Sequence, residues 1–179
     1  MENNKTRNER IRLIKIITIT IIISLLFKVF IFSRAHVSGP SMMPTLNNND
    51  STLIEKVSLL TRNFERGQIV IFDSENTNHD VYIKRIIGIE GDKIEISGGH
   101  VFVNGTKLKE AYLKKNIVTN SGTLLHENQK ITVSKGFVFV LGDNRAVSVD
   151  SRYFGDINVK SIKGHVIIKI FPLNGFKFF

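Results

Sequence analysis

Two residues of this sequence, a serine and a lysine, have the chemistry needed for nucleophilic catalysis. Ser41 lies in the stretch VSGPSMMPTL (37–46), and Lys84 lies in YIKRIIGIEGD (82–92). A lysine acts as a general base only when it is unprotonated, and burial against apolar neighbours lowers its pKa towards that state. A neutral amine can then take the proton of a serine hydroxyl, which gives a Ser-Lys form of catalysis that needs no histidine.

Each of these residues alone also fits an ordinary structural role. A serine beside Gly39 and Pro40 is typical of a turn, although the same glycine and proline can hold the backbone around Ser41 in one orientation. A lysine in a strand usually faces solvent. Lys84 and Arg85 are adjacent, however, so in a strand they face opposite sides and only one can easily reach solvent. We therefore expect one of the two charges to lie inward or at a cleft.

A third stretch, GDNRAVSVDSRYFG (142–155), follows the apolar run FVFVL. Its glycine, aspartate and asparagine are typical of a polar turn. Asp150 and Arg152 can also form a charge-assisted pair, and the hydroxyl of Ser148 can orient a neutral amine. We expect this stretch to support a site.

Composition narrows the possible classes of function. The chain has 179 residues, no cysteine and five histidines without ligand-like spacing, so the sequence predicts no thiolate nucleophile, no metal centre and no cofactor. The formal net charge is +9, and the basic residues are spread along the chain. Nucleic-acid binding proteins cluster Lys and Arg with interleaved aromatic residues, whereas an anionic membrane or cell-wall surface needs only a diffuse excess. We favour the membrane surface and expect no nucleic acid.

The N-terminal region predicts a membrane anchor. Residues 13–32 are almost continuously apolar or hydroxylic, with Lys15 and Lys28 near the two ends. About 20 such residues span a bilayer core, and terminal lysines reach the headgroups. The alternative is a cleaved signal peptide, but charged or basic residues flank the lone Ala35, so no convincing cleavage site follows. Positive charge before the helix predicts a cytoplasmic segment over 1–12 and an exported domain over 33–179.

The exported part predicts a mostly β fold in one domain. Runs rich in β-branched residues recur between turn signals such as Gly98-Gly99 and Asn104-Gly105, whereas helical periodicity is weak. The expected strand regions are residues 68–73, 81–91, 93–105, 130–144 and 165–171. Residues 107–129 show no strand pattern and predict a surface excursion.

Four stretches in this order after an anchor resemble the four signature boxes of bacterial type I signal peptidases. They are SGPSMMPTL, RGQIVIF, YIKRIIGIEGD and GDNRAVSVDSR. The single predicted anchor is similar to the compact form typical of Gram-positive bacteria. The resemblance implies a signal-peptidase-like β-fold of antiparallel sheets behind one transmembrane helix. It also implies a membrane-anchored serine endopeptidase that removes signal peptides from exported preproteins, cutting after small residues at −3 and −1.

The resemblance assigns roles to individual residues. It implies that Ser41 is the acylating nucleophile, that its backbone N–H binds the oxyanion, and that Lys84 is the general base. Ser148 would then orient the lysine, and Asp150 with Arg152 would form a supporting ion pair. The remaining assignments are Asp143, Asn144 and Arg145 as residues that shape the site from behind, and Val37, Met42, Leu46, Tyr82 and Ile83 as the substrate groove.

Two positions depart from the commoner family pattern. Gly39 stands where some relatives carry a serine whose hydroxyl assists the oxyanion hole, so no side-chain donor is available from that position. Gln68 replaces the commoner aspartate at the start of the strand box, which removes a charge but leaves Ser41 and Lys84 untouched.

The implied partners are signal-peptide-bearing preproteins and the lipid bilayer, with action near the export translocon and a place in the cell membrane. Two rival hypotheses stay open. A silent, tethered paralogue would bind exported chains without cutting them, but it should lack Ser41 or Lys84. A self-cleaving regulator of the related Ser-Lys class would carry a DNA-binding domain and a scissile linker, and neither is visible in the sequence.

Overall fold

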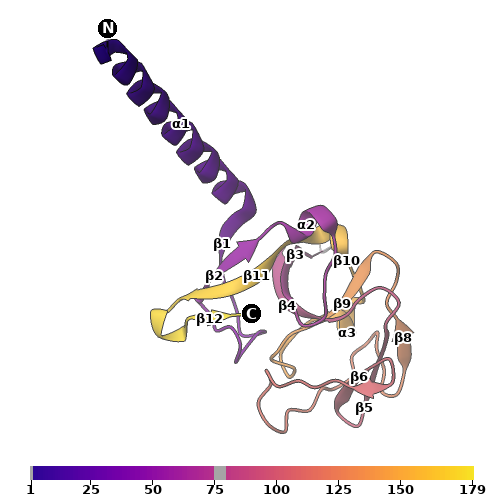
Figure 1. Ribbon diagram of the computed structural model, residues 1–179. Coiled ribbons are helices and arrows are strands. Elements are labelled where there is room, and N and C mark those ends of the chain that lie inside the picture. The colour runs from indigo at the N-terminus through magenta and orange to yellow at the C-terminus, as the bar shows by residue number, and fades with distance from the viewer. Residues whose placement is uncertain (1, 75–79) are drawn as a thin grey trace.

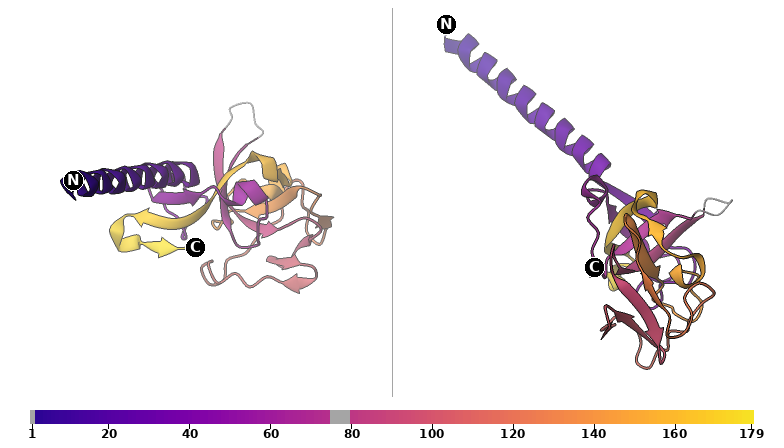
Figure 2. Two further views of the ribbon diagram at one scale, coloured as in Figure 1. Left: turned by 45° about the horizontal axis from the view of Figure 1, so that its top comes forward. Right: turned by 90° about the vertical axis from the view of Figure 1, so that its right-hand side faces the viewer.

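The computed structural model describes residues 2–74 and 80–179, without the side chains of residues 2–6, 26–30 and 173. A long helix, α1 (Glu2–Ile31), projects from a β-rich body (Figures 1 and 2). The helix includes most of the expected anchor and the expected cytoplasmic segment. The helix ends at Ile31, one residue before the end of the expected anchor, because Phe32 pairs with Glu55 as the first residue of a strand.

The expected anchor is therefore confirmed as a helix but not as a membrane span. Within the described part of the chain, no helix combines the length and the apolar composition needed to cross a bilayer. Part of the expected anchor, the side chains of residues 26–30, lies outside the described residues.

The body consists of two antiparallel sheets, which confirms the mostly β prediction. The larger sheet has eight strands in the order β1-β2-β11-β3-β4-β9-β10, with β12 paired to β11, and the smaller has the order β7-β6-β5-β8. The strands of the larger sheet are β1 (Phe32–His36), β2 (Ser51–Glu55), β3 (Ile69–Asp73), β4 (Val81–Gly88), β9 (Phe137–Leu141), β10 (Ile157–Asn158), β11 (Ile162–Phe171) and β12 (Lys177–Phe178). Those of the smaller sheet are β5 (Lys93–Ser97), β6 (His100–Val103), β7 (Thr106–Lys107) and β8 (Lys130–Thr132). The short helices are α2 (Ser58–Thr61), α3 (Ser151–Phe154), and the 3₁₀ turns Val159–Ser161 and Leu173–Gly175.

All five predicted strand regions contain strands, with different bounds. The region 93–105 holds both β5 and β6, joined at Gly98 and Gly99, which have φ values of +55° and +77°. The region 130–144 likewise holds two strands, β8 and β9, which pair in different sheets. Turn chemistry explains the first division, because two consecutive residues with positive φ reverse the chain tightly.

The serine-bearing turn is built into the hydrophobic core. Met42 and Leu46 are fully buried and pack with Ile54, Ile69 and other side chains of the large sheet. Since these two side chains leave water completely, the turn between β1 and β2 is fixed to the sheet directly after Ser41.

Strand β4 is paired unevenly along its length. It pairs with β3 from Val81 to Arg85, but its pairing with β9 begins only at Arg85. On the β9 side, Val81–Ile83 therefore has no strand partner among the described residues. This half-strand is an open edge that lies directly before Lys84.

The segment 107–129 is more than a surface excursion. It contains no helix or strand between β7 and β8, as its composition predicts. Thr119 and Leu125 are nevertheless buried, and the backbone N–H of Leu124 donates to the carbonyl of Arg152. The segment thus packs against the polar stretch that follows β9.

Candidate active site

The structure brings Ser41 and Lys84 into direct contact. Lys84 Nζ donates a hydrogen bond to Ser41 Oγ at 2.9 Å and a second to the carbonyl of Ile83 at 3.1 Å. Lys84 is only 3% exposed. The predicted nucleophile and base therefore lie at hydrogen-bonding distance in a dry setting.

Burial changes the acid–base chemistry of Lys84. Loss of hydration lowers the pKa of its ammonium from 10.5 to about 8, and the negative charge of Asp150 opposes this shift. A lysine with this pKa has a substantial neutral fraction in mildly alkaline water, so it can accept the proton of Ser41.

The loop after β9 holds the serine turn in place. The backbone N–H of Asn144 donates to the carbonyl of Ser41 at 2.9 Å, and its side-chain amide donates to the carbonyl of Pro40 at 3.1 Å. Gly39 has a φ of +88°, a conformation that favours glycine, and its N–H donates to the side chain of Asn48. Asn144 thus holds the backbone on which Ser41 lies.

Arg85 and Asp143 form a buried, bidentate ion pair beside the site. The Arg85 guanidinium donates to the two carboxylate oxygens of Asp143 at 2.9 and 2.6 Å, and Thr45 Oγ1 donates to the same carboxylate at 2.5 Å. The Arg85 guanidinium also lies 4.0 Å from the centre of the Tyr112 ring. Both Lys84 and Arg85 are buried, although alternation alone predicts that one of them reaches solvent. Tyr112 of the segment 107–129 lies over the Arg85 guanidinium.

Asp150 and Arg152 form the predicted ion pair, which is completely enclosed. Arg152 donates to the carboxylate at 2.7 and 2.9 Å. Asp150 also accepts from the backbone N–H of Gly142 at 3.0 Å, and Arg152 donates to the carbonyls of Arg145 and Ser148. The pair fixes both ends of the polar loop, from Gly142 to the start of α3.

Arg145 connects this loop to the segment 107–129. Its guanidinium donates to the carbonyl of Gly142, to the hydroxyl of Thr119 and to the carboxylate of Glu110. Thr119, Glu110 and Tyr112 are supporting residues that sequence reasoning missed. No local pattern marks them, because each meets its arginine from a distant part of the chain.

Ser148 lies in the site but does not contact Lys84 through a hydrogen bond. Its Oγ is buried and has no hydrogen-bond partner among the described residues. It lies against Gly142, where a Cβ would come within 2.2 Å of it. The predicted orienting bond to the lysine is therefore not made in this structure.

A cavity of about 260 Å³ opens beside Ser41 between the β1 end and the open edge of β4; we call it the Ser41 cavity. Its lining residues are Ala35, His36, Val37, Ser38, Ser41, Ile71, Val81, Tyr82 and Ile83. Three of the five predicted groove residues, Val37, Tyr82 and Ile83, thus line it. Met42 and Leu46 do not, because their side chains point into the core that supports the turn.

The chain is similar to known signal peptidases over most of its length. The family model described as signal peptidase, peptidase S26, matches residues 10–171. "Signal peptidase I P" of Bacillus subtilis subsp. natto is 39% identical over 165 residues, covering 90% of this chain and 89% of that protein. "Signal peptidase IB" of Staphylococcus aureus is 37% identical, with 91% of each chain covered. A crystal structure of a signal peptidase I from Enterococcus faecalis is 33% identical, covers 57% of this chain and 96% of that chain, and has a TM-score of 0.48.

The lowered pKa of Lys84 predicts how the reactivity of Ser41 depends on pH. Below pH 8 the amine is mostly protonated, so acylation of Ser41 by an acylating probe should slow about tenfold per pH unit. Above pH 8 the rate should level off. Intact-mass spectrometry measures the rate, with Ser41→Ala as the unreactive control. A rate that stays constant from pH 6 to 9 would argue against a lysine base.

Gly142 is predicted to be indispensable for the position of the nucleophile. A Cβ at this position would lie 2.6 Å from the carbonyl oxygen of Ser41 and 2.5 Å from Cβ of Ser148. Gly142→Ala should therefore displace the serine turn and reduce acylation of Ser41 about 100-fold, as for a misplacement of about 1 Å. Gly98→Ala, which has nothing within 4 Å of the added Cβ, is the control for backbone strain alone. Equal acylation rates in the two variants would contradict the prediction.

Proposed function

This chain belongs to the signal peptidase family, peptidase S26, and on that premise we propose that it is a membrane-anchored serine endopeptidase that removes signal peptides from exported preproteins. The observation that carries the proposal is the hydrogen bond from Lys84 Nζ to Ser41 Oγ in a buried site. A paralogue without activity does not need a lysine whose pKa is lowered to about 8 and whose amine contacts a serine hydroxyl, so this geometry favours an enzyme.

The first half of the reaction forms an acyl-enzyme. Neutral Lys84 takes the proton of Ser41, and Oγ attacks the carbonyl carbon of the substrate residue at −1. The developing oxyanion accepts a hydrogen bond from the backbone N–H of Ser41, since Gly39 offers no side-chain donor. The tetrahedral intermediate then collapses, the C–N bond breaks, and the lysine ammonium gives its proton to the leaving amine.

The second half releases the signal peptide. Lys84 is neutral again after it has protonated the leaving amine, so it can take a proton from a water molecule. The resulting hydroxide attacks the ester carbonyl, and the bond to Ser41 Oγ breaks as the oxygen regains its proton from the lysine. Asn144, in the loop after β9, holds the backbone at Pro40 and Ser41, which keeps Ser41 Oγ beside Lys84 through both halves.

The open edge of β4 supports an extended substrate. A peptide can pair its backbone with Val81–Ile83 as an added strand, which gives affinity with little dependence on sequence. Its side chains at −1 and −3 then enter the Ser41 cavity, where Ile71 and Ile83 form apolar walls. The limited volume of about 260 Å³ for both side chains favours small residues at these positions.

We further propose that residues 13–32, all but the last of which belong to α1, anchor the protein in the cell membrane near the export translocon. Apolar side chains such as Ile14, Ile17 and Leu25 are exposed all around its middle, and arginines precede them. The positive residues keep the N-terminus cytoplasmic and leave the β body on the outer face. The substrate would then be cut at the surface where it leaves the membrane.

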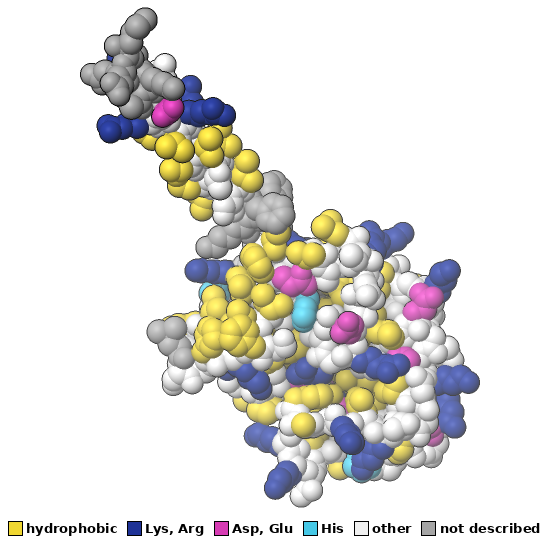
Figure 3. Space-filling model, in the orientation of Figure 1, with side chains coloured by type: hydrophobic (Ala, Val, Ile, Leu, Met, Phe, Trp, Pro, Cys, Tyr) yellow, Lys and Arg dark blue, Asp and Glu magenta, His cyan; other side chains and the backbone are white. Residues whose placement is uncertain are grey.

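Exposed aromatic side chains near the helix support a membrane-facing surface on the body. Figure 3 shows hydrophobic side chains gathered on the body close to the end of the helix. Phe171, Phe176 and Phe178 are all more than half exposed, and the last two rings contact each other edge to face. Exposed groups of this kind are typical of contact with a protein or a membrane.

The proposed function predicts cleavage of a preprotein at one bond. The full-length chain in detergent, incubated with a preprotein that has alanine at −3 and −1, should release a mature protein of the mass expected for that cut. Ser41→Ala and Lys84→Ala should each reduce the rate at least about 10³-fold. The control Lys93→Ala removes an exposed lysine of β5 and should cut normally. Normal cleavage by Ser41→Ala would reject the mechanism.

The membrane-facing surface predicts a difference between membrane-bound and soluble substrates. The double variant Phe176→Ser/Phe178→Ser should process a preprotein in proteoliposomes several-fold more slowly, because less apolar area enters the interface. Its rate on a short soluble peptide should stay unchanged. Val118→Ser, which alters an exposed apolar residue in the segment 107–129, serves as the matched control. Equal loss on both substrates would point to damage to the fold instead.

A further inference from the structure

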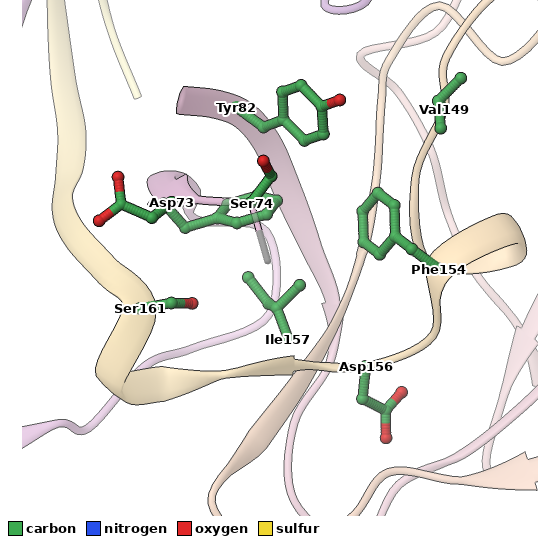
Figure 4. A pocket seen from close by; sticks show the side chains of 9 residues that line it. Asp73, Ser74, Tyr82, Val149, Phe154, Asp156, Ile157 and Ser161 are labelled. Carbon is green, nitrogen blue, oxygen red and sulfur yellow. The ribbon is translucent and has the colours of Figure 1, made fainter. Parts of the chain in front are cut away.

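A second cavity lies close to the Ser41–Lys84 pair and has no part in the mechanism above. It measures about 380 Å³, within the range of about 300–1,000 Å³ that is usual for ligand pockets. Its lining residues are Phe72, Asp73, Ser74, Tyr82, Val149, Phe154, Asp156, Ile157 and Ser161, most of which Figure 4 labels. We call it the Phe154 cavity.

The walls of the Phe154 cavity are largely aromatic. The rings of Tyr82 and Phe154 are stacked with their centres 6.3 Å apart, and Phe72 meets both of them edge to face. Figure 4 shows the Tyr82, Phe154 and Ile157 side chains arranged around a common space. An apolar or aromatic side chain entering this space would bury its surface against these walls.

The charged residues nearby do not make the cavity an ion site. Figure 4 shows the carboxylate of Asp156 directed away from Phe154 and Ile157, and one of its oxygens accepts from the backbone N–H of Ser134. Asp73 forms an ion pair with Lys163 at 2.7 Å. The interior therefore selects for apolar surface.

The register of β3 and β4 relates the two cavities. Phe72 pairs with Tyr82 and Val70 pairs with Lys84, so these four side chains share one face of the two strands. Ile71 and Ile83 lie on the other face, where they line the Ser41 cavity. The two cavities thus lie on opposite faces of the β3–β4 pair, and Tyr82 borders both of them.

Lys84 lies on the side of the Phe154 cavity. Its Nζ is 5.3 Å from the centre of the Tyr82 ring, whose neighbour in that cavity is Phe154. Val149, which lines the same cavity, directly follows Ser148, the buried hydroxyl beside Gly142. The amine of Lys84 and the Phe154 cavity therefore lie on the same face of β4.

We propose that the Phe154 cavity is a substrate subsite that binds a large apolar side chain from the first residues of the mature segment, after the cut. This inference rests on the proposed function. Lys84 must protonate the leaving amine, so the mature segment begins on the side of Lys84. In an extended chain, neighbouring side chains point to opposite faces, so the side chains at −2 and +1 both point away from the Ser41 cavity and towards the Phe154 cavity. The position of Lys84 favours the residues after the cut.

The test uses peptides that differ only in the position of one phenylalanine around the cut. All carry alanine at −3 and −1, and a single phenylalanine replaces alanine at +1, +2 or +3 in turn; one further peptide carries it at −2. We expect phenylalanine at one of the three mature positions to raise kcat/KM about tenfold over the all-alanine peptide, as filling an apolar pocket does. The full-length protein in detergent is the enzyme.

Two neighbouring valines provide the matched variants. Val149 and Val147 are 56% and 55% exposed, but only Val149 lines the cavity. Val149→Trp should fill the mouth of the cavity and abolish the gain from phenylalanine, while its rate on the all-alanine peptide stays close to that of the native protein. Val147→Trp should keep the gain. Both substitutions change exposed side chains, and thermal unfolding checks that each variant is folded.

Three results would overturn the inference: no gain at any mature position, a gain that survives Val149→Trp, or a gain from phenylalanine at −2 alone. In each of these cases the native protein still cuts the all-alanine peptide, so the proposed function stands. If the native protein cuts none of the peptides, the proposed function fails and the subsite falls with it.

Discussion

The site depends on one constraint: Lys84 must stay buried without a neutralising partner. Among the buried cations that the structure describes, every one except Lys84 lies within ion-pair distance of a carboxylate. These pairs are Arg85 with Asp143, Arg145 with Glu110, Arg152 with Asp150 and Lys169 with Asp50. Each carboxylate near the reaction centre is paired with an arginine, so little negative charge remains to stabilise the protonated form of Lys84. Desolvation then dominates and lowers its pKa.

The same ion pairs also form the mechanical support of the site. Asp143 ties β4 to Thr45 in the serine turn, and Asp150 ties Gly142 to the start of α3. A buried pair stabilises little by itself but is costly to break, since the remaining charge loses its partner. The arrangement therefore favours one geometry of the loop that carries Asn144, and through Asn144 one position of Ser41.

The sequence predicts the reacting groups well because they lie in short local patterns. The alternation of β4 predicts only that Lys84 or Arg85 lies inward, and the resemblance of the four stretches to the signature boxes predicts that Ser41 and Lys84 meet. The burial of Arg85 and Arg145 by a distant segment of the chain cannot be predicted in this way. Arg85 is covered and Glu110 meets Arg145 because the segment 107–129 packs over the loop, which only long-range folding decides. Met42 lies in the core and not in the lining of the Ser41 cavity, a difference that the sequence does not reveal because an apolar residue beside Ser41 suits a pocket wall and a core equally well.

The unpartnered hydroxyl of Ser148 is best understood through the proposed reaction cycle. A buried hydroxyl without a hydrogen-bond partner is disfavoured by about 1–3 kcal/mol. We therefore look for a step of the reaction in which the Ser148 hydroxyl gains a partner. Lys84 now directs its bonds to Ser41 and to the carbonyl of Ile83. Once acylation removes the Ser41 hydroxyl as a partner, the lysine needs another acceptor or donor within the same enclosed space. Ser148, whose carbonyl is held by Arg152, carries an unpartnered hydroxyl that suits this role in the proposed cycle.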